Sequence, residues 1–348
     1  MFYFKQVLCP QFLARFALVP AALALALLSA PASAQRKDVK MMLDWVMQGT
    51  HAPFFVAQEK GYYKEGGLNV AVEAGKGATN VAVIVASGTF DFGWVDLPTM
   101  IKFNAQNPSS PLIATYISFD DSPLAIITLK SKNIRSVKDL DGRKIAGGPG
   151  TAVHDTISIL LKAANAEGVK INFLAVQPQL FGPMVARGEA DGTAGFTNSN
   201  IPALLDVGIK LEDIYPIRYA DFGANLYGLA LVTTRAYAEK NPETVRAFVR
   251  AVNKGTIDTI KNPAAALKIM KSRDAMMKDN IEKVRLDIAL GLTYTDWVKK
   301  HGMSVVQPQR LKQTIDSVVD AYKLPSAPKP EDVYTDKFLP PVAERMVK

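Results

Sequence analysis

Cysteine is almost absent from this chain of 348 residues, in which Cys9 is the single example. Cys9 stands before the apolar run at residues 16–28 rather than after it, so it is not placed to accept a lipid. We expect residues 1–34 to be removed, and the remaining chain then contains no cysteine. That excludes disulfides, thiolate metal sites and a cysteine nucleophile together.

Runs long enough to span a membrane are missing as well. The apolar run at residues 16–28 is shorter than the roughly 20 apolar residues that a spanning helix needs. Lys5 and Arg15 precede this run, and the small residues 32–34 follow it. These features are typical of a secretory signal peptide, and they favour cleavage near Ala34 over an uncleaved anchor. The sequence therefore predicts that the protein is exported.

Charge of one sign is not concentrated anywhere in the chain. There are 41 basic and 33 acidic residues, and loss of Lys5 and Arg15 with the signal peptide would leave a net charge of +6. No dense block of Lys and Arg occurs, so nucleic acid is not an expected partner. The motifs Gly-x-Ser-x-Gly and His-Glu-x-x-His are absent. We expect neither a metal nor a cofactor.

Short apolar runs alternate with helical patterns in the first half of the chain that follows the signal peptide. Residues 68–73 and 192–196 are typical of strands, whereas residues 54–60 and a segment from about Thr151 have helical patterns. This alternation predicts βαβ units and mostly parallel sheets. Residues 235–322 are almost entirely helical in pattern.

One short pattern occurs in both halves of this region. Residues 86–91, Ala-Ser-Gly-Thr-Phe-Asp, are echoed by residues 186–191, Ala-Arg-Gly-Glu-Ala-Asp. In both places a helix is expected to end at the glycine, and the Asp opens an apolar strand. Ligands of open α/β sheets bind outside the carboxyl ends of the strands. The echo therefore predicts two lobes of similar build that face each other across a ligand cleft.

The 314 residues after position 34 fit two domains of about 150 residues each. We predict a first lobe made of residues 35–125 and 225–348, and a second lobe made of residues 126–224. Extended segments at residues 123–128 and 222–227 would connect the lobes as two hinge crossings. We expect the protein to be a monomer.

Several segments have a distinctive sequence. They are Leu-Asp-Trp at 43–45, Thr-His-Ala-Pro-Phe-Phe-Val-Ala-Gln-Glu-Lys-Gly-Tyr-Tyr-Lys-Glu at 50–65, and residues 67–70, 86–93, 140–145 and 241–248. Over roughly residues 39–260 the chain thereby resembles the periplasmic proteins that bind thiamine-pyrimidine precursors, sulfonates, taurine or nitrate.

The resemblance implies an α/β, type II periplasmic-binding-protein fold with two doubly wound lobes, a ligand cleft and two hinge crossings. It also implies the substrate-binding component of an ABC importer, which delivers a small organic solute to a permease at the inner membrane. The solute would be thiamine-pyrimidine-like, a sulfonate, or of an aromatic or carboxylate class. A periplasmic sensor subunit needs the same clamp, so the sequence leaves that alternative open.

The fungal synthase of the thiamine pyrimidine shares this opening, which raises an enzymatic alternative. In that enzyme, the resemblance implies a lysine that binds pyridoxal phosphate two residues after an Asp-x-Gly segment, and a histidine four residues after the lysine. The Asp-x-Gly segment of this chain is at residues 91–93. Val95 and Thr99 occupy those positions here. Neither can form a Schiff base or offer a ring nitrogen. The synthase's cysteine-rich cluster is also missing, because Leu-Tyr-Gly-Leu-Ala stands at residues 226–230. We therefore expect no enzymatic activity.

Candidate binding residues of the first lobe lie where expected strands end. Asp44 and Trp45 end the first strand, and the Trp45 ring would either stack on a planar solute or belong to the core. His51 is either a site residue or a structural hydrogen-bonding group. Trp94 and Asp96 flank the end of the third strand. Asp96 would bind an amino or hydroxyl group of the solute, or cap the following helix.

Candidate binding residues of the second lobe lie on two loops. Gly150 and Thr151 join a strand to a helix, where backbone N–H groups suit an anion or a carbonyl oxygen, although the glycines are equally consistent with a tight turn. Phe196 and Asn198 follow the echoed strand and offer a ring face and an amide. The predicted ligand-binding set thus draws on both lobes.

Two further candidate residues lie near the second crossing, and one segment of the second lobe departs from the family pattern. Asp221 and Asn225 lie near the second crossing, where they would line the hinge side of the cleft. The pyrimidine-binding proteins of the family have an aromatic residue and a glutamate near the position of Asn198, whereas this chain has Thr-Asn-Ser-Asn at residues 197–200. That departure points away from the standard pyrimidine ligand.

Overall fold

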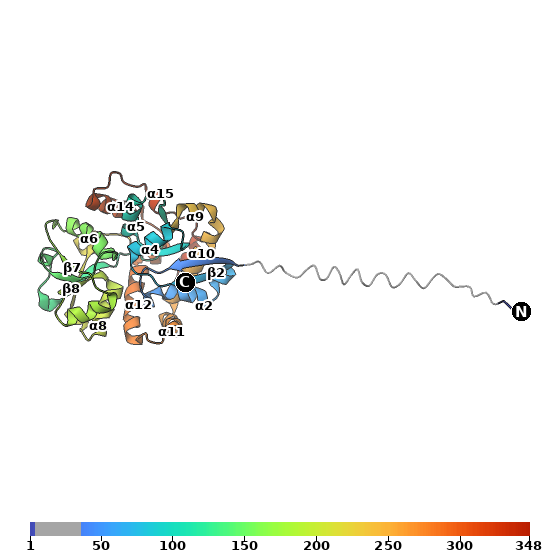
Figure 1. Cartoon of the computed structure of the whole chain (residues 1–348), viewed down its shortest axis with the longest axis horizontal. Coiled ribbons are helices and arrows are strands. Elements are labelled where there is room, and N and C mark those ends of the chain that lie inside the picture. The colour runs from blue at the N-terminus through green and yellow to red at the C-terminus, as the bar shows by residue number, and fades with distance from the viewer. Residues whose placement is uncertain (4–35) are drawn as a thin grey trace. The chain divides into compact units, whose positions relative to one another are not determined.

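The computed structural model describes residues 1–3 and 36–348, so the predicted signal peptide lies outside the described residues except for its first three positions. All elements named below belong to one unit that runs from Arg36 to Lys348 (Figure 1). In these described ranges, no helix combines the length and the apolar character that crossing a membrane requires.

Two five-stranded sheets form the framework, and they have the same topology. The first sheet has the order β2-β1-β3-β10-β4 and the second has the order β7-β6-β8-β5-β9. The strands of the first sheet are β1 (Lys37–Met42), β2 (Leu68–Glu73), β3 (Phe92–Asp96), β4 (Leu112–Ile117) and β10 (Leu229–Thr234). Those of the second are β5 (Leu124–Leu129), β6 (Lys144–Ala146), β7 (Asn172–Leu174), β8 (Gly192–Phe196) and β9 (Ile214–Arg218).

Each sheet is mixed rather than mostly parallel. β1 pairs in parallel with β2 and β3, and β6 pairs in parallel with β7 and β8. β10 and β5 are instead antiparallel to both of their neighbours. The expectation of mostly parallel sheets is therefore wrong for these two strands. Each of them enters its sheet directly from the other sheet, so it is not the product of a βαβ crossover and can run in the opposite direction.

Helices cover both sheets. The longer ones are α2 (Ala52–Glu59), α4 (Ala78–Ala86), α5 (Leu97–Gln106), α6 (Ala152–Ala163), α8 (Thr197–Asp206), α10 (Pro242–Lys261), α11 (Pro263–Arg273), α12 (Asp279–Thr293) and α14 (Pro308–Tyr322). The shorter ones are α3 (Tyr62–Glu65), α7 (Phe181–Ala186), α9 (Arg235–Lys240), α13 (Asp296–His301), α15 (Pro330–Val333) and α16 (Val342–Arg345). Proline at the first position of α10, α11 and α14 suits a helix start, because that position needs no N–H donor.

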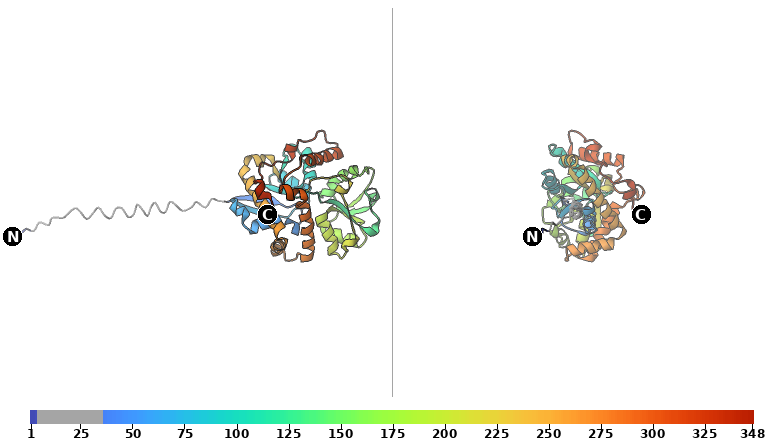
Figure 2. Two further views of the ribbon diagram at one scale, coloured as in Figure 1. Left: turned by 180° about the vertical axis from the view of Figure 1, so that it is seen from behind. Right: turned by 90° about the vertical axis from the view of Figure 1, so that its right-hand side faces the viewer.

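The later part of the chain returns to the first sheet. β10 is inserted between β3 and β4, and α10 packs against α2 and β2. Figure 2 shows the orange and red helices gathered around the blue strands, with the green elements on the other side of an orange helix. We call the first sheet with its helices the first lobe, and the second sheet with α6, α7 and α8 the second lobe. The exact domain boundaries given above stay predictions.

The repeated sequence pattern corresponds to a repeated set of contacts. Gly88 and Gly188 both adopt positive φ, of 76° and 75°, at the ends of α4 and α7. The carboxylate of Asp91 accepts the backbone N–H of Lys40 at 2.8 Å, and the carboxylate of Asp191 accepts that of Lys144 at 3.1 Å. Each Asp thereby ties the start of one strand to its parallel neighbour. The two lobes have the same local construction at equivalent places.

Candidate functional site

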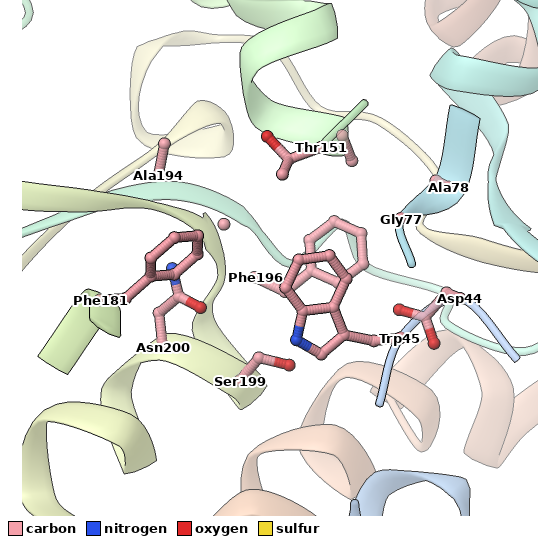
Figure 3. A pocket seen from close by; sticks show the side chains of 12 residues that line it. Asp44, Trp45, Gly77, Ala78, Thr151, Phe181, Ala194, Phe196, Ser199 and Asn200 are labelled. Atoms are coloured by element: carbon pink, nitrogen blue, oxygen red, sulfur yellow. The ribbon is translucent and has the colours of Figure 1, made fainter. Parts of the chain in front are cut away.

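A small cavity lies between the two lobes at the carboxyl ends of β1 and β8 (Figure 3). Its volume is about 30 Å³, roughly twice the 10–15 Å³ that a cavity needs to hold one water molecule. The first lobe contributes Asp44, Trp45, Gly77 and Ala78, and the second contributes Thr151, Ala152, Phe181, Ala194, Gly195, Phe196, Ser199 and Asn200. Four of the residues that the sequence predicts as ligand-binding thus meet here: Asp44, Trp45, Thr151 and Phe196.

Asp44 is held in place by His51. The two side chains are joined by a contact of 2.9 Å between His51 Nε2 and Asp44 Oδ1. His51 Nδ1 accepts the backbone N–H of Gln48 at 3.0 Å, so the proton of a neutral ring lies on Nε2 and is donated to Asp44. His51 is fully buried and does not line the cavity. Of its two predicted roles, the structural one describes its position, and its effect is to orient the Asp44 carboxylate.

Trp45 reaches across the boundary between the lobes. Its half-buried ring packs against an apolar cluster of the second lobe that includes Ala125, Ala146 and Phe181. Figure 3 shows the indole in the middle of the cavity residues, with Thr151 on one side and Ser199 on the other. The alternative of a core tryptophan inside one lobe does not describe this position. Trp45 is a cavity residue.

Trp94 and Asp96 lie behind the cavity rather than in its wall. Trp94 is buried in an edge-to-face cluster with ring centroids 5.4 Å from His51, 5.3 Å from Phe54 and 5.2 Å from Phe119. The carboxylate of Asp96 accepts the N–H of Thr99 at 3.0 Å and caps α5. The capping role predicted as one alternative is therefore present.

Burial has a measurable consequence for Asp96. The side chain is inaccessible to solvent, and this desolvation raises the pKa of Asp96 to about 6. The hydrogen bond from Thr99 lowers the pKa, and the nearby charge of Asp44 raises it further. One oxygen, Oδ1, has no hydrogen-bond partner. Because desolvation disfavours the charged form, Asp96 takes up a proton at milder pH than an exposed carboxylate does.

The glycine loop of the second lobe is fixed by its own hydrogen bonds. The Thr151 hydroxyl donates to the carbonyl of Gly148 at 2.8 Å, and the N–H of Gly150 points to the carboxylate of Asp155. Thr151 lines the cavity, while Gly150 stands one residue outside its wall. The predicted anion site at this loop therefore has one of its N–H groups already occupied by a carboxylate.

Polar contacts between the lobes border the cavity. Asn198 Nδ2 donates to the hydroxyl of Thr50 at 3.3 Å, and the Ser199 hydroxyl donates to Gln48 Oε1 at 2.9 Å. Asn198 thus faces the first lobe instead of the cavity. Gln48 was not predicted as part of the site, because a single amide side chain in a loop belongs to no sequence motif that would indicate binding.

Other residues of the cavity wall carry a weak signal in the sequence. Asn200 follows the echoed strand together with Phe196 and Asn198, and the echo also places Ser199, which lies between Asn198 and Asn200. Phe181 begins α7 and has no such signal. Asp221 and Asn225 are outside the wall: Asp221 forms an exposed ion pair of 2.7 Å with Arg218, and Asn225 is exposed. Their predicted role on the hinge side of the cleft stays a prediction.

The cavity has a definite chemical character. Its wall presents three aromatic rings, one carboxylate, two hydroxyls and one amide, and it contains no Lys or Arg side chain. Such a wall suits a planar solute with hydrogen-bonding groups. In the described ranges 1–3 and 36–348, no group of three His, Cys, Asp or Glu side chains is arranged to hold a metal ion.

A family model described as NMT1/THI5 like matches residues 48–266. The chain belongs to the NMT1/THI5-like family. This NMT1/THI5-like chain is 29% identical over 238 residues to the formylaminopyrimidine-binding protein of Halalkalibacterium halodurans, with 67% of this chain and 70% of that protein covered. It is 25% identical over 242 residues to the 4-amino-5-hydroxymethyl-2-methylpyrimidine phosphate synthase of Schizosaccharomyces pombe, covering 66% and 68%. The resemblance inferred from the sequence is confirmed.

Solved structures establish the fold of the NMT1/THI5-like chain. The alkanesulfonate-binding protein SsuA from Xanthomonas axonopodis superposes with a TM-score of 0.64 at 15% identity, covering 85% of this chain and 96% of that one. The periplasmic nitrate-binding protein NrtA from Synechocystis gives a TM-score of 0.61 at 14% identity, covering 87% of each. At this identity the likeness shows the fold alone. The predicted α/β periplasmic-binding-protein fold is confirmed.

Proposed function

We propose that this chain is the solute-binding component of an ABC importer and that its solute is a planar, nitrogen-containing ring that is neutral or cationic. The observation that carries the proposal is the cavity between the lobes, where three aromatic rings surround the carboxylate of Asp44. Trp45, Phe181 and Phe196 provide ring faces for stacking, and Asp44 accepts hydrogen bonds from an amino group. The formylaminopyrimidine-binding relative supports the same class of solute.

An anionic solute fits this cavity less well. No Lys or Arg side chain lines it, so a sulfonate, nitrate or carboxylate group would lack a charged partner. The Asp44 carboxylate, held by His51 at 2.9 Å, would repel such a group in a poorly solvated site. Among the solute classes expected from the sequence, we therefore propose the thiamine-pyrimidine-like class. Residues 197–200 lack the glutamate of the standard pyrimidine-binding proteins, and in this proposal Asp44 provides the carboxylate instead.

Binding requires a change of conformation. A volume of about 30 Å³ is roughly a tenth of the smallest ordinary ligand pocket, so a ring cannot enter the arrangement described here. Residues of both lobes form the wall, so the lobes open to admit a ring and then close around it less tightly than in the arrangement described here. Closure then follows from the greater affinity of the closed form for the solute. The permease of the importer would recognise the closed form.

The relatives also include synthases, and the site argues against that activity here. Val95 and Thr99, which stand at the lysine and histidine positions implied by the family resemblance, are both buried. Neither side chain can bind pyridoxal phosphate covalently. We expect no absorbance of an internal Schiff base when pyridoxal phosphate is added, and no pyrimidine phosphate as product. Appearance of either would restore the enzymatic alternative.

Export to the periplasm and a monomeric state complete the proposal. The signal peptide proposed at residues 1–34 supports export, and the periplasmic proteins of the same fold support the location. Amino-terminal sequencing of the exported protein tests the cleavage near Ala34. Light scattering tests the monomer, and a dimer in solution would contradict it.

A thermal-shift screen tests the proposed solute class. The panel contains aminopyrimidines, alkanesulfonates, nitrate and aromatic carboxylates. A solute that binds only the native state increases the free energy of unfolding, by about 2.7 kcal/mol when its concentration is a hundred times the Kd. The midpoint temperature of unfolding rises as a result. We expect aminopyrimidines to raise the midpoint and the anions to leave it unchanged. A shift with sulfonate or nitrate alone would contradict the proposed solute class.

A further inference from the structure

Asp155 connects the two lobes at a distance from the cavity wall. It lies in the first turn of α6 in the second lobe. Its Oδ2 accepts the hydroxyl of Thr79, from the first turn of α4 in the first lobe, at 2.6 Å. The same carboxylate accepts the N–H of Gly150 at 3.1 Å and contacts His154 Nδ1 at 2.8 Å. One carboxylate thus holds both the other lobe and the glycine loop of its own lobe.

The backbone of Asp155 makes two more contacts with the first lobe. Lys102 Nζ, from α5, donates to the Asp155 carbonyl at 2.7 Å, and the hydroxyl of Tyr322, from α14, donates to the same oxygen. The Lys102 ammonium also lies 4.3 Å from the centre of the Tyr322 ring. Figure 1 shows α6 beside α5 and α14. Three side chains of the first lobe therefore converge on one residue of the second.

The neighbouring backbones approach closely at the same place. A Cβ atom on Gly77 would lie 2.3 Å from the carbonyl oxygen of Gly150, far inside van der Waals contact. Gly77 precedes α4, and Gly150 is held by Asp155, so this approach and the Thr79 hydrogen bond occur together. Gly77 and Thr151 both line the cavity. Asp155 thus holds the loop that contains Gly150 against the start of α4, next to Gly77.

We propose that Asp155 is a positioning residue that stabilises the closed form and sets the affinity for the solute without touching it. This inference rests on the proposed solute-binding function. The hydrogen bond from Thr79 to Asp155 joins two lobes, so it exists only when they are closed. This contact lies outside the cavity wall, so a solute-bound form with a wider cavity can keep it. An interaction that the solute-bound form has and the open form lacks lowers the apparent Kd by at most its own factor, which is reached when the solute-free protein is mainly open.

Isosteric replacements test this role. Thr79→Val removes the hydroxyl that reaches Asp155 but preserves the side-chain shape. Asp155→Asn removes the charge. A hydrogen bond to a charged group is typically worth a factor of about ten or more in an equilibrium constant, so each change should raise the Kd by up to about tenfold. The double variant should lose no more than Asp155→Asn alone, because the two groups act through one contact.

A matched control comes from the same lobe. Thr89 is exposed, and its hydroxyl contacts only Ser87 of its own lobe. Thr89→Val therefore changes the same chemical group without touching the second lobe, and its Kd should equal that of the wild type. Unfolding midpoints of all variants without solute separate weaker closure from weaker folding, since the Thr79 contact contributes little to the stability of either lobe alone.

The distance between the lobes provides a second readout that needs no solute. Spin labels at Lys64→Cys in the first lobe and Glu212→Cys in the second report that distance in the exported protein, with Cys9→Ser in the full-length chain. Both labelled side chains are exposed. In the solute-free protein, Thr79→Val should shift the distribution to longer distances, and Thr89→Val should not.

The outcomes separate this inference from the proposed function. If Thr79→Val binds the solute as tightly as the wild type and its distance distribution is unchanged, Asp155 has no role in closure. If Asp155→Asn weakens binding but Thr79→Val does not, Asp155 acts through the Gly150 loop alone, and the inference is wrong. If the wild type binds no solute of the panel, the proposed function fails, and the distance measurement alone decides the role of Asp155.

Discussion

Trp45 is the residue whose replacement should affect the solute most directly. Its ring stands in the cavity and packs against the apolar cluster of the second lobe. An aromatic ring enclosed by a site typically contributes more than about 2 kcal/mol to binding, so Trp45→Ala should raise the Kd by a factor of about thirty. Titration calorimetry measures this change. Val46→Ala, at an exposed neighbour, is the control and should bind normally. Unchanged affinity in Trp45→Ala would remove Trp45 from the site.

Asp96 should make stability depend on pH. In the unfolded chain the pKa of an Asp is about 3.9, whereas burial raises the pKa of Asp96 to about 6 in the folded protein. Between these values the folded state binds more protons, so the free energy of unfolding decreases as the pH rises through this window. The stabilising contribution of Asp96 is complete below about pH 4 and lost above about pH 6.

Asp96→Asn tests this pH dependence. The amide oxygen can still accept the N–H of Thr99, so the cap of α5 is kept. The variant should be more stable than the wild type by about 2 to 3 kcal/mol at about pH 7.5, and the difference should shrink at about pH 5. Urea unfolding at both pH values measures it. An advantage that is the same at both pH values would contradict the assignment to Asp96.

For single residues, the sequence predicts which side chains lie at the ends of strands, but it does not predict which of them are buried. Asp44 and Trp45 follow a strand, so their place at the cleft follows from the rule for open α/β sheets. Whether Asp96 caps a helix or binds a solute depends on burial, which the sequence does not show. Phe181 enters the wall only because α7 packs against α8, and no local pattern contains that contact.

Among the elements, the starts of α4 and α6 bring the two lobes close together. Gly77→Ala places a Cβ 2.3 Å from the Gly150 carbonyl, at a residue whose φ is +117°. Gly150→Ala also has a strained φ, of +89°, but its Cβ would meet no atom within 4 Å. Both variants therefore share the backbone strain, and only Gly77→Ala adds a clash between lobes. Gly77→Ala should weaken solute binding far more in calorimetry. Equal losses would show that the approach is not needed for closure.

A second contact between the lobes involves α12 and α8. Arg285 is buried, pairs with Glu282 at 3.2 Å and donates to the Ser199 carbonyl at 2.7 Å. Its burial and partial desolvation lower the pKa of Arg285, although the charge of Glu282 opposes this. Removing one partner of a buried pair leaves the other charge unpaired, which typically costs about 3 kcal/mol or more.

Arg285→Met should therefore lower the free energy of unfolding by about 3 kcal/mol in urea denaturation. The control is Lys283→Met, because Lys283 forms an exposed pair with Asp287 on the same helix. That exposed pair should contribute less than about 1 kcal/mol. Adding Glu282→Gln to Arg285→Met should restore part of the loss. A similar effect of both lysine and arginine replacements would contradict the buried pair.

The elements themselves were partly predictable. β2 and β8 have the predicted bounds. In β2 the apolar residues Leu68, Val70 and Val72 recur at every second position, which is typical of a strand with one buried face. β5 was expected only as an extended crossing at residues 123–128, yet it is a full strand between β8 and β9 in the second sheet. β9 was not predicted. It is an edge strand that contains Pro216, and proline weakens a strand pattern.

For the whole molecule, the two-lobed plan follows from a repeat that is visible in the sequence. The contacts of Asp91 and Asp191 show that this repeat is structural. The size of the cavity could not be predicted, because it depends on how closely the lobes approach and on the place of Trp45 between them. The closed arrangement without room for a ring implies that opening precedes binding.

Titration calorimetry with one neutral or cationic aminopyrimidine and one alkanesulfonate tests the central claim most directly. The claim is that the cavity around Asp44 and Trp45 selects an aromatic nitrogenous solute over an anion. We expect saturable binding of the aminopyrimidine with a negative heat-capacity change, since closure buries apolar surface. The sulfonate should give no heat of binding. Saturable binding of the sulfonate, with none of the aminopyrimidine, would contradict the account.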